Sequence, residues 1–205
     1  MHISWLGRTA FKIQAKTNEG DINILIDPYK MEIGSCPRNL SADIVLLTRG
    51  DEDLITLSGK PFVLSSAGEC DVKGVLITSV QGHEAKDTML RVDAEDMSLG
   101  HLGLSNKQLN EEQKEALSGV DILCVPVGGI ECFDEEEAIK AINDIEPSVV
   151  IPMAMKSDND PKARGLELFL KEMGMSQATK PEKKIIIKKK ELPIDETQIM
   201  VVAKE

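Results

Sequence analysis

Short runs that alternate hydrophobic and polar residues fill the first third of the chain, and this period of two is typical of β-strands. Brief polar turns separate the first three runs, HISWLG (2–7), AFKIQAK (10–16) and INILIDP (22–28), as expected of an antiparallel meander. Two later runs, ADIVLLT (42–48) and PFVLSS (61–66), are denser in aliphatic and β-branched residues. They therefore predict buried central strands.

Helix signals appear only in the second half of the chain. Asn110 precedes an amphipathic stretch and has Gln113 three residues later, which is the spacing of a capping box. Asp134 and Glu137 repeat this spacing before a second stretch. The segment PKARGLELFLKEMGM (161–175) carries apolar residues at helical intervals. The sequence therefore predicts three helices.

Further strand-like runs lie before, between and after these helical stretches in the sequence. The strand-like runs of the remaining chain are GVLITSV (74–80), TMLRVDAEDMSLGHLG (88–103), DILCVPV (121–127), SVVIPMA (148–154), KIIIKKK (184–190) and TQIMVVAKE (197–205). A simple doubly wound sheet fits this order poorly, because the first half lacks crossover helices. The order instead predicts an α/β (α+β) fold in which two sheets pack together with helices outside, an αββα sandwich.

Composition narrows the classes of function. The 205 residues carry a formal net charge of -11 and only 3% aromatic residues, so we expect no nucleic-acid binding. No run approaches the roughly 18 to 20 apolar residues that cross a bilayer. The four cysteines show no CxxC spacing, which favours reduced thiols. With no linker-like segment in the sequence, we expect a single cytoplasmic domain spanning 1–205.

The stretch LLTRGDEDLITL (46–57) indicates a site, because a strand ending in Thr48 runs into a tight turn rich in carboxylates. Six segments in order carry a wider resemblance: WLGRTAFKI, ILIDPY, ADIVLLTRGDEDL, GHLGLSN, DILCVPVGG and VVIPMAM. In this order they resemble the metallo-β-lactamase superfamily, in particular its small metal-dependent hydrolases. The resemblance implies an αββα sandwich with a metal site at one edge of both sheets.

In that superfamily the strand ending in Thr leads into a THxHxDH motif. Its side chains hold one or two zinc ions, which lower the pKa of a bound water to about 7 and so produce a hydroxide nucleophile. The four ligand positions of the motif read Arg49, Asp51, Asp53 and Leu54 in this chain. Only Asp53 matches the motif, and Asp51 is an oxygen substitute.

The resemblance places the other ligand positions elsewhere in the chain. His83 is the candidate for the histidine in the middle of the chain, and Arg8 replaces the histidine near the first strand. Leu104 replaces the aspartate of an HxGD pattern, and Ala154 replaces the last histidine. A guanidinium does not deprotonate in proteins and so cannot bind a metal, and alkyl side chains offer no lone pair. The resemblance thus implies a vestigial metal site.

Two interpretations of the acidic turn remain open. Asp51 and Asp53, with His83, could hold a divalent cation weakly, because magnesium and calcium prefer oxygen ligands. In the simpler interpretation, Asp51 pairs with Arg49 or Arg8, and Asp53 caps the turn by accepting backbone hydrogen bonds.

The sequence favours a non-catalytic binding or assembly module without a cofactor, whose partner is a small anion or a protein. The alternative is a hydrolase with a noncanonical metal site. We expect Arg8 and Arg49 to meet in the vacated cavity, with Asp27 or a carboxylate of the acidic turn beside one of them. The turn from Arg49 to Leu54 should lie close to Leu104 and Ala154. His101 we expect to be a buried, hydrogen-bonded residue.

Overall fold

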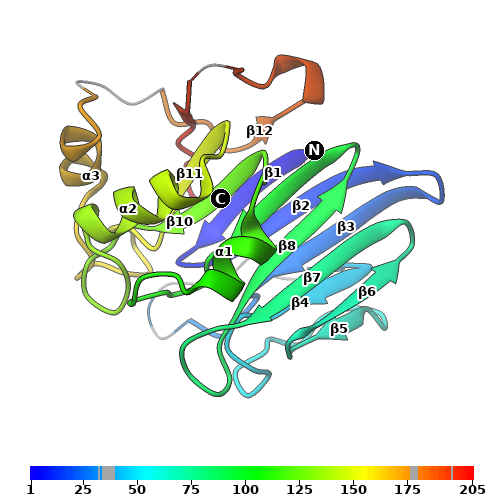
Figure 1. Cartoon of the computed structure of the whole chain (residues 1–205). Helices are drawn as coiled ribbons and strands as arrows, with labels where there is room; N and C mark the ends of the chain where they lie inside the picture. Colours follow the sequence, from blue (N-terminus) through cyan, green and yellow to red (C-terminus); the bar gives the residue numbers. More distant parts are fainter. Residues whose placement is uncertain (32, 34–39, 176–179, 195) are drawn as a thin grey trace.

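Two β-sheets pack face to face in this protein, with helices outside (Figure 1). The computed structural model describes residues 1–31, 33, 40–175, 180–194 and 196–205. The predicted α/β architecture of two packed sheets is confirmed. None of the helices described is long and apolar enough to cross a membrane.

The first sheet contains the amino-terminal meander. Its order is β12 (Ile185–Ile186), β1 (His2–Gly7), β2 (Ala10–Thr17), β3 (Gly20–Ile26), β4 (Ile44–Leu46) and β5 (Phe62–Leu64). Strands β1 to β3 are antiparallel, whereas β4 and β5 run parallel to β3. The carboxyl ends of β3 and β4 therefore lie at the same edge of the sheet.

The second sheet combines a meander with parallel strands. Its order is β13 (Gln198–Ile199), β11 (Val149–Met153), β10 (Ile122–Pro126), β9 (Met97–His101), β8 (Thr88–Ala94), β7 (Val75–Gln81) and β6 (Gly68–Val72). Strands β9, β10 and β11 are parallel neighbours. As predicted, β3 and β4 belong to one sheet, and β10 and β11 belong to the other.

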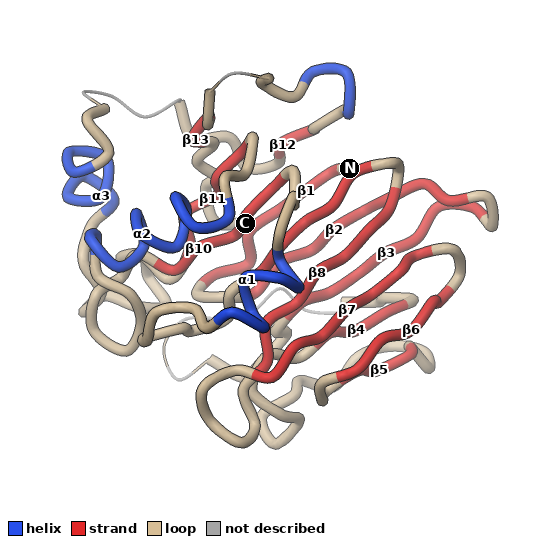
Figure 2. Tube along the Cα trace, viewed as in Figure 1, coloured by secondary structure: helices blue, strands red, loops and turns tan. Residues whose placement is uncertain are grey.

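The described helices α1 (Glu111–Leu117), α2 (Glu135–Ile145) and α3 (Leu166–Glu172) gather on the outer side of the second sheet (Figure 2). The predicted capping boxes are confirmed, because each N-cap side chain and its N3 partner exchange hydrogen bonds in α1 and α2. The third helix begins at Leu166 instead of near residue 161, since the preceding residues form a loop that reaches the edge of both sheets.

Loops cover much of the outer face of the first sheet. Its apolar residues, including Leu25, Val45 and Leu47, form a separate cluster with side chains from the segments after β3 and β4. The larger cluster fills the space between the sheets and beneath the helices. In the described residues no helix covers this outer face, so the loops that form the site also close part of the core.

Some predicted strands are shorter than expected, and one strand was not predicted. The two closing runs contribute only Ile185–Ile186 and Gln198–Ile199, and a short 3₁₀ helix (Lys189–Glu191) follows the first of them. Strand β6 was not predicted because it is a short edge strand whose inward face, Cys70 and Val72, is only half-buried. Three cysteines are free thiols, Cys70, Cys124 and Cys132, and the remaining cysteine, Cys36, lies outside the described residues.

Candidate functional site

A cavity of about 370 Å³ opens at one end of the two sheets. Loops at the ends of six strands form its wall. These loops are far apart from one another in the sequence. Representative residues from the loops after β1, β3, β4, β9, β10 and β11 are Arg8, Asp27, Arg49, Leu104, Glu131 and Ala154. The cavity thus lies where loops of both sheets converge.

The structure brings five of the eight positions selected from sequence to this cavity: Arg8, Arg49, Asp53, Leu104 and Ala154. The other three lie apart from its wall. Asp51 is exposed, and Leu54 packs in the apolar cluster outside the first sheet. The His83 ring contacts the backbone carbonyl of Lys107 at 3.1 Å in a separate exposed loop.

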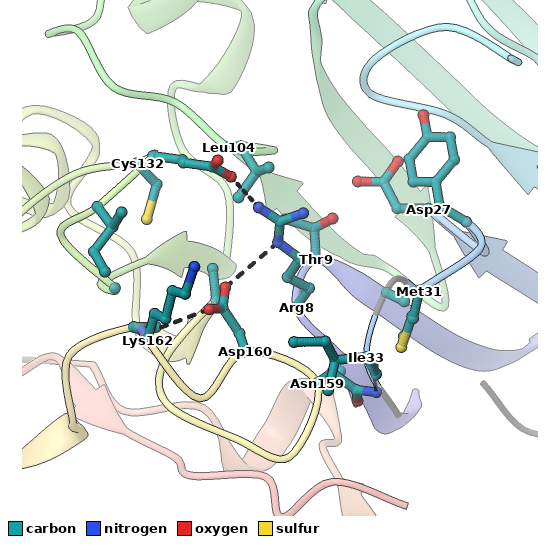
Figure 3. A pocket seen from close by; sticks show the side chains of 18 of the residues that line it. Arg8, Thr9, Asp27, Met31, Ile33, Leu104, Cys132, Asn159, Asp160 and Lys162 are labelled. Carbon is teal, nitrogen blue, oxygen red and sulfur yellow. Dashed lines mark hydrogen bonds and ion pairs between the residues drawn. The ribbon is translucent and has the colours of Figure 1, made fainter. Parts of the chain in front are cut away.

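Arg8 is neutralised by acids that sequence reasoning did not find. Its guanidinium forms an ion pair with Glu131 and lies 3.5 Å from an oxygen of Asp160. In Figure 3 the side chain reaches toward Asp160, whereas Asp27 lies on the other side of Thr9. We refer to Arg8, Glu131 and Asp160 as the Arg8 cluster.

Arg49 lies in a different environment. Its guanidinium carbon stands 4.2 Å from the centre of the Tyr29 ring, and its Nε is buried without a hydrogen-bond partner. Among the residues described, no ion pair joins Arg8 or Arg49 to Asp27, Asp51 or Asp53. The predicted pairing with these acids is therefore wrong, because the acids of the second sheet's loops reach Arg8 first.

Hydrogen bonds fix the surroundings of Arg49. The buried Asp27 carboxylate accepts from Thr48 N at 2.7 Å and Thr48 Oγ1 at 2.6 Å, which ties the ends of β3 and β4 together. The Tyr29 hydroxyl accepts from Arg49 N at 3.0 Å and donates to Gly50 O at 2.9 Å. We refer to Asp27, Tyr29, Thr48 and Arg49 as the Arg49 cluster.

Tyr29 is a site residue that sequence reasoning missed. It is the only tyrosine of the chain, and it follows a buried strand directly in the ILIDPY segment. This position after a strand end was the signal that could have identified Tyr29 as a site residue. Burial raises the pKa of its hydroxyl, and the charge of Asp27 adds to this effect, so the phenol stays protonated.

His101 lies beneath the cavity wall and contacts Thr9, a residue of that wall. It is fully buried, as expected, and its Nδ1 accepts from Gly103 N at 3.2 Å. The other ring nitrogen, Nε2, therefore carries the proton and donates to Thr9 O at 3.0 Å. Burial lowers the pKa of the imidazole, which keeps the ring neutral. His101 thus positions Thr9 on the wall.

Three non-glycine residues of the wall have a left-handed backbone. The φ angles are +50° at Arg8, +50° at Asp27 and +52° at Ala154. Such residues cost about 1 kcal/mol or more each, so the surrounding structure must enforce them. One enforcing contact is the hydrogen bond from Ala154 N to Arg8 O at 2.9 Å. A Cβ at Gly128 would also collide with the Ala154 carbonyl, so this close approach needs glycine.

The side chains on the wall do not fit a zinc site. Two guanidiniums would repel a dication, and Leu104 and Ala154 offer no ligand atom. Within the described part of the chain, no three His, Cys, Asp or Glu side chains group closely enough to hold a metal, so Asp51, Asp53 and His83 are not brought together. Burial raises the pKa of the Cys132 thiol on the wall, which opposes the thiolate form that binds metals.

Solved structures share this fold over nearly the whole chain. A Thermotoga maritima protein of the metallo-β-lactamase superfamily, proposed to be a Zn-dependent hydrolase, superposes with a TM-score of 0.83 and 25% identity. The alignment covers 98% of each chain. Igni18, a metallo hydrolase from Ignicoccus hospitalis, has a TM-score of 0.67 and 17% identity, and the alignment covers 91% of this chain and 99% of that one.

Sequence comparison identifies relatives in archaea. A UPF0173 metal-dependent hydrolase of Methanopyrus kandleri is 24% identical, with 75% of this chain and 83% of that protein covered. A UPF0173 protein of Pyrococcus abyssi is 26% identical, with 75% and 82% covered. The profile of the family "Beta-lactamase superfamily domain" matches residues 2–154. Because this match spans most of the chain and both sheets superpose on superfamily structures, the protein belongs to the β-lactamase superfamily.

Proposed function

We propose that this protein binds a small anion in its cavity and does not carry out metal-dependent hydrolysis. The observation that carries the proposal is the presence of Arg49, a cation without an ion pair among the described residues, on a wall where Leu104 and Ala154 provide no ligand atoms. The Methanopyrus kandleri relative is named a metal-dependent hydrolase. Such a hydrolase needs a metal-bound water as its nucleophile, and the wall of this cavity offers no suitable set of ligands for that metal.

Arg8 acts as an internal cation in this proposal. It comes from the turn after β1 and contacts acids in the loops after β10 and β11. The guanidinium therefore joins three loops through two ion pairs and one hydrogen bond, without any metal ion. Because two carboxylates already surround it, Arg8 has little attraction left for a ligand.

Arg49 supplies the charge that a ligand would meet. Its guanidinium lies over the Tyr29 ring, and Asp87 is close enough to act on it electrostatically. Among the described residues, however, no carboxylate lies within ion-pair distance of it. A partly buried cation without a partner is unfavourable, and a bound anion removes this cost. The ligand is held in place by hydrogen bonds and charge.

Metal content tests the first half of this proposal. Protein purified without chelator should contain far less than one zinc per chain by elemental analysis. Added zinc should raise the melting temperature little, since a ligand of the native state stabilises by RT ln(1 + [L]/Kd). A chelator-treated sample of the same preparation is the control.

Tightly bound stoichiometric zinc would overturn the proposal and would support the alternative of a hydrolase with a noncanonical metal site. Loss of such a metal in an Asp51→Asn, Asp53→Asn, His83→Gln variant would assign it to those three residues. Retention of the metal in that variant would place it elsewhere.

A further inference from the structure

We propose that the ligand of the cavity is an organic monocarboxylate with an apolar body. This inference rests on the proposed anion binding and names the chemical class of the anion. Three observations carry it: the balance of charge around the cavity, the geometry of Arg49 and the size of the cavity.

The charges of the wall disfavour a second negative charge on the ligand. The basic and acidic side chains on the wall are equal in number: Arg8, Lys30, Arg49 and Lys162 against Asp27, Asp53, Glu131 and Asp160. The two lysines are exposed and well solvated. The Arg8 cluster holds two acids for one guanidinium, so it repels a second anionic group on the ligand.

The geometry of Arg49 suits an oxyanion such as a carboxylate. A planar guanidinium presents parallel N–H groups that match two oxygens of a carboxylate or of a phosphate, so the size of the cavity must decide between these two. Contact with Tyr29, at 4.2 Å from the ring centre, restricts the position of this guanidinium. Hydrogen bonds from Arg49 N to the Tyr29 hydroxyl and from that hydroxyl to Gly50 O hold the ring in turn. The recognition group is therefore positioned before a ligand arrives.

The size of the cavity favours an organic ligand. Its volume of about 370 Å³ has room for about a dozen water molecules at roughly 30 Å³ each. An inorganic phosphate would leave most of this space filled with water. Apolar side chains from three different loops, Met31, Leu104 and Ile130, line the same space. A carboxylate on Arg49 would leave its apolar body free to contact them.

Calorimetric titration of the full-length protein with four probes tests the inference. The probes are octanoate, the neutral isostere 1-octanol, the dicarboxylate octanedioate and inorganic phosphate. We expect octanoate to bind about tenfold or more tightly than octanol, because one charge-assisted hydrogen bond to carboxylate is worth at least this factor. It should also bind more tightly than octanedioate, whose second charge meets the acids of the Arg8 cluster, and than phosphate, which has no apolar body. Melting temperatures with the same probes provide an independent reading.

Variants locate the binding group. Arg49→Gln should weaken octanoate binding about tenfold or more, and Arg49→Lys should restore only part of the loss, since an ammonium lacks the planar fork. The matched control is Arg91→Gln, which removes the same charge at a residue outside this cavity. Arg91→Gln should bind octanoate as the unmodified protein does.

The possible outcomes separate the two proposals. Phosphate binding that matches octanoate and depends on Arg49 would overturn the carboxylate class but keep the anion cavity. Octanedioate binding equal to octanoate would overturn the assignment of one charge. Equal binding of octanol and octanoate, or no binding of any anion, would overturn both this inference and the proposed anion binding.

Discussion

The Arg8 and Arg49 clusters contain the same kind of cation in opposite electrostatic situations. Arg8 contacts two acids from the second sheet's loops, whereas Arg49 lies over an aromatic ring and forms no ion pair with any described residue. The acid of the Arg49 cluster, Asp27, is engaged by Thr48 instead. The difference teaches that the loop positions of the acids decide whether a cation is an internal crosslink or stays without an ion pair, as the proposed ligand-binding role of Arg49 requires.

The largest effect should follow from breaking the Arg49 cluster at its buried acid. Asp27→Ala leaves both Thr48 donors without their acceptor in the protein interior, and we expect a loss of about 3 kcal/mol in the free energy of unfolding. Urea denaturation measures this loss. Asp27→Asn is the matched control, because it keeps one oxygen acceptor and should cost less. Unchanged stability in Asp27→Ala would show that the cluster does not depend on this acid.

The free energy of unfolding should depend on pH because of His101, the buried histidine that contacts Thr9 between the two clusters. Its pKa is lowered by burial, so below about pH 6.5 the unfolded chain binds a proton that the native protein resists. Stability from this group is therefore present above pH 6.5 and falls as the pH drops, by at most about 1.4 kcal/mol per pH unit for one proton. Urea denaturation between pH 7.5 and 5 measures the slope.

His101→Gln removes the titrating ring and should flatten this slope, even though its stability at neutral pH is lower. His83→Gln is the matched control, since His83 lies in an exposed loop. An identical slope in the His101→Gln variant and the unmodified protein would contradict the assignment of the pH dependence to His101.

A smaller difference in the free energy of unfolding should distinguish substitution of Arg8 from substitution of Arg49. Arg8→Met leaves Glu131 and Asp160 without their cation, but both acids are partly exposed, so we expect a cost of only about 1 kcal/mol that shrinks with added salt. Arg49→Met removes an unpaired charge and a stacking contact, which oppose each other, and should change stability by about 0.5 kcal/mol or less. Equal costs for both variants would remove the distinction between the clusters.

The sequence predicts much of the fold because local signals and topology agree there. The capping boxes at Asn110 and Asp134 depend on residues three positions apart, and both formed as expected. The resemblance also selected Arg49, Leu104 and Ala154, which the fold brings to one cavity. Each of these residues follows the end of a strand, and the hydrophobic pattern predicts where strands end.

The charge partners of the site could not be predicted in the same way. Glu131 and Asp160 lie in loops whose paths depend on tertiary contacts, and no spacing in the sequence connects either of them to Arg8. The acids close to the arginines in sequence, Asp51 and Asp53, were the natural but wrong choice. Pairing of exposed charges is decided by a few ångströms of loop position, which a hydrophobic pattern does not encode.

The left-handed turns at Arg8, Asp27 and Ala154 have a consequence for protein engineering. The main chain of the cavity is held by backbone contacts, such as that between Ala154 N and Arg8 O, and by glycine at the tight approach of Gly128. Side chains at Arg8 and Ala154 can therefore change while their Cβ atoms keep their directions, whereas Asp27 must stay because it accepts two hydrogen bonds from Thr48. The cavity is a scaffold on which a designer could graft new binding groups one position at a time, with the backbone already in place.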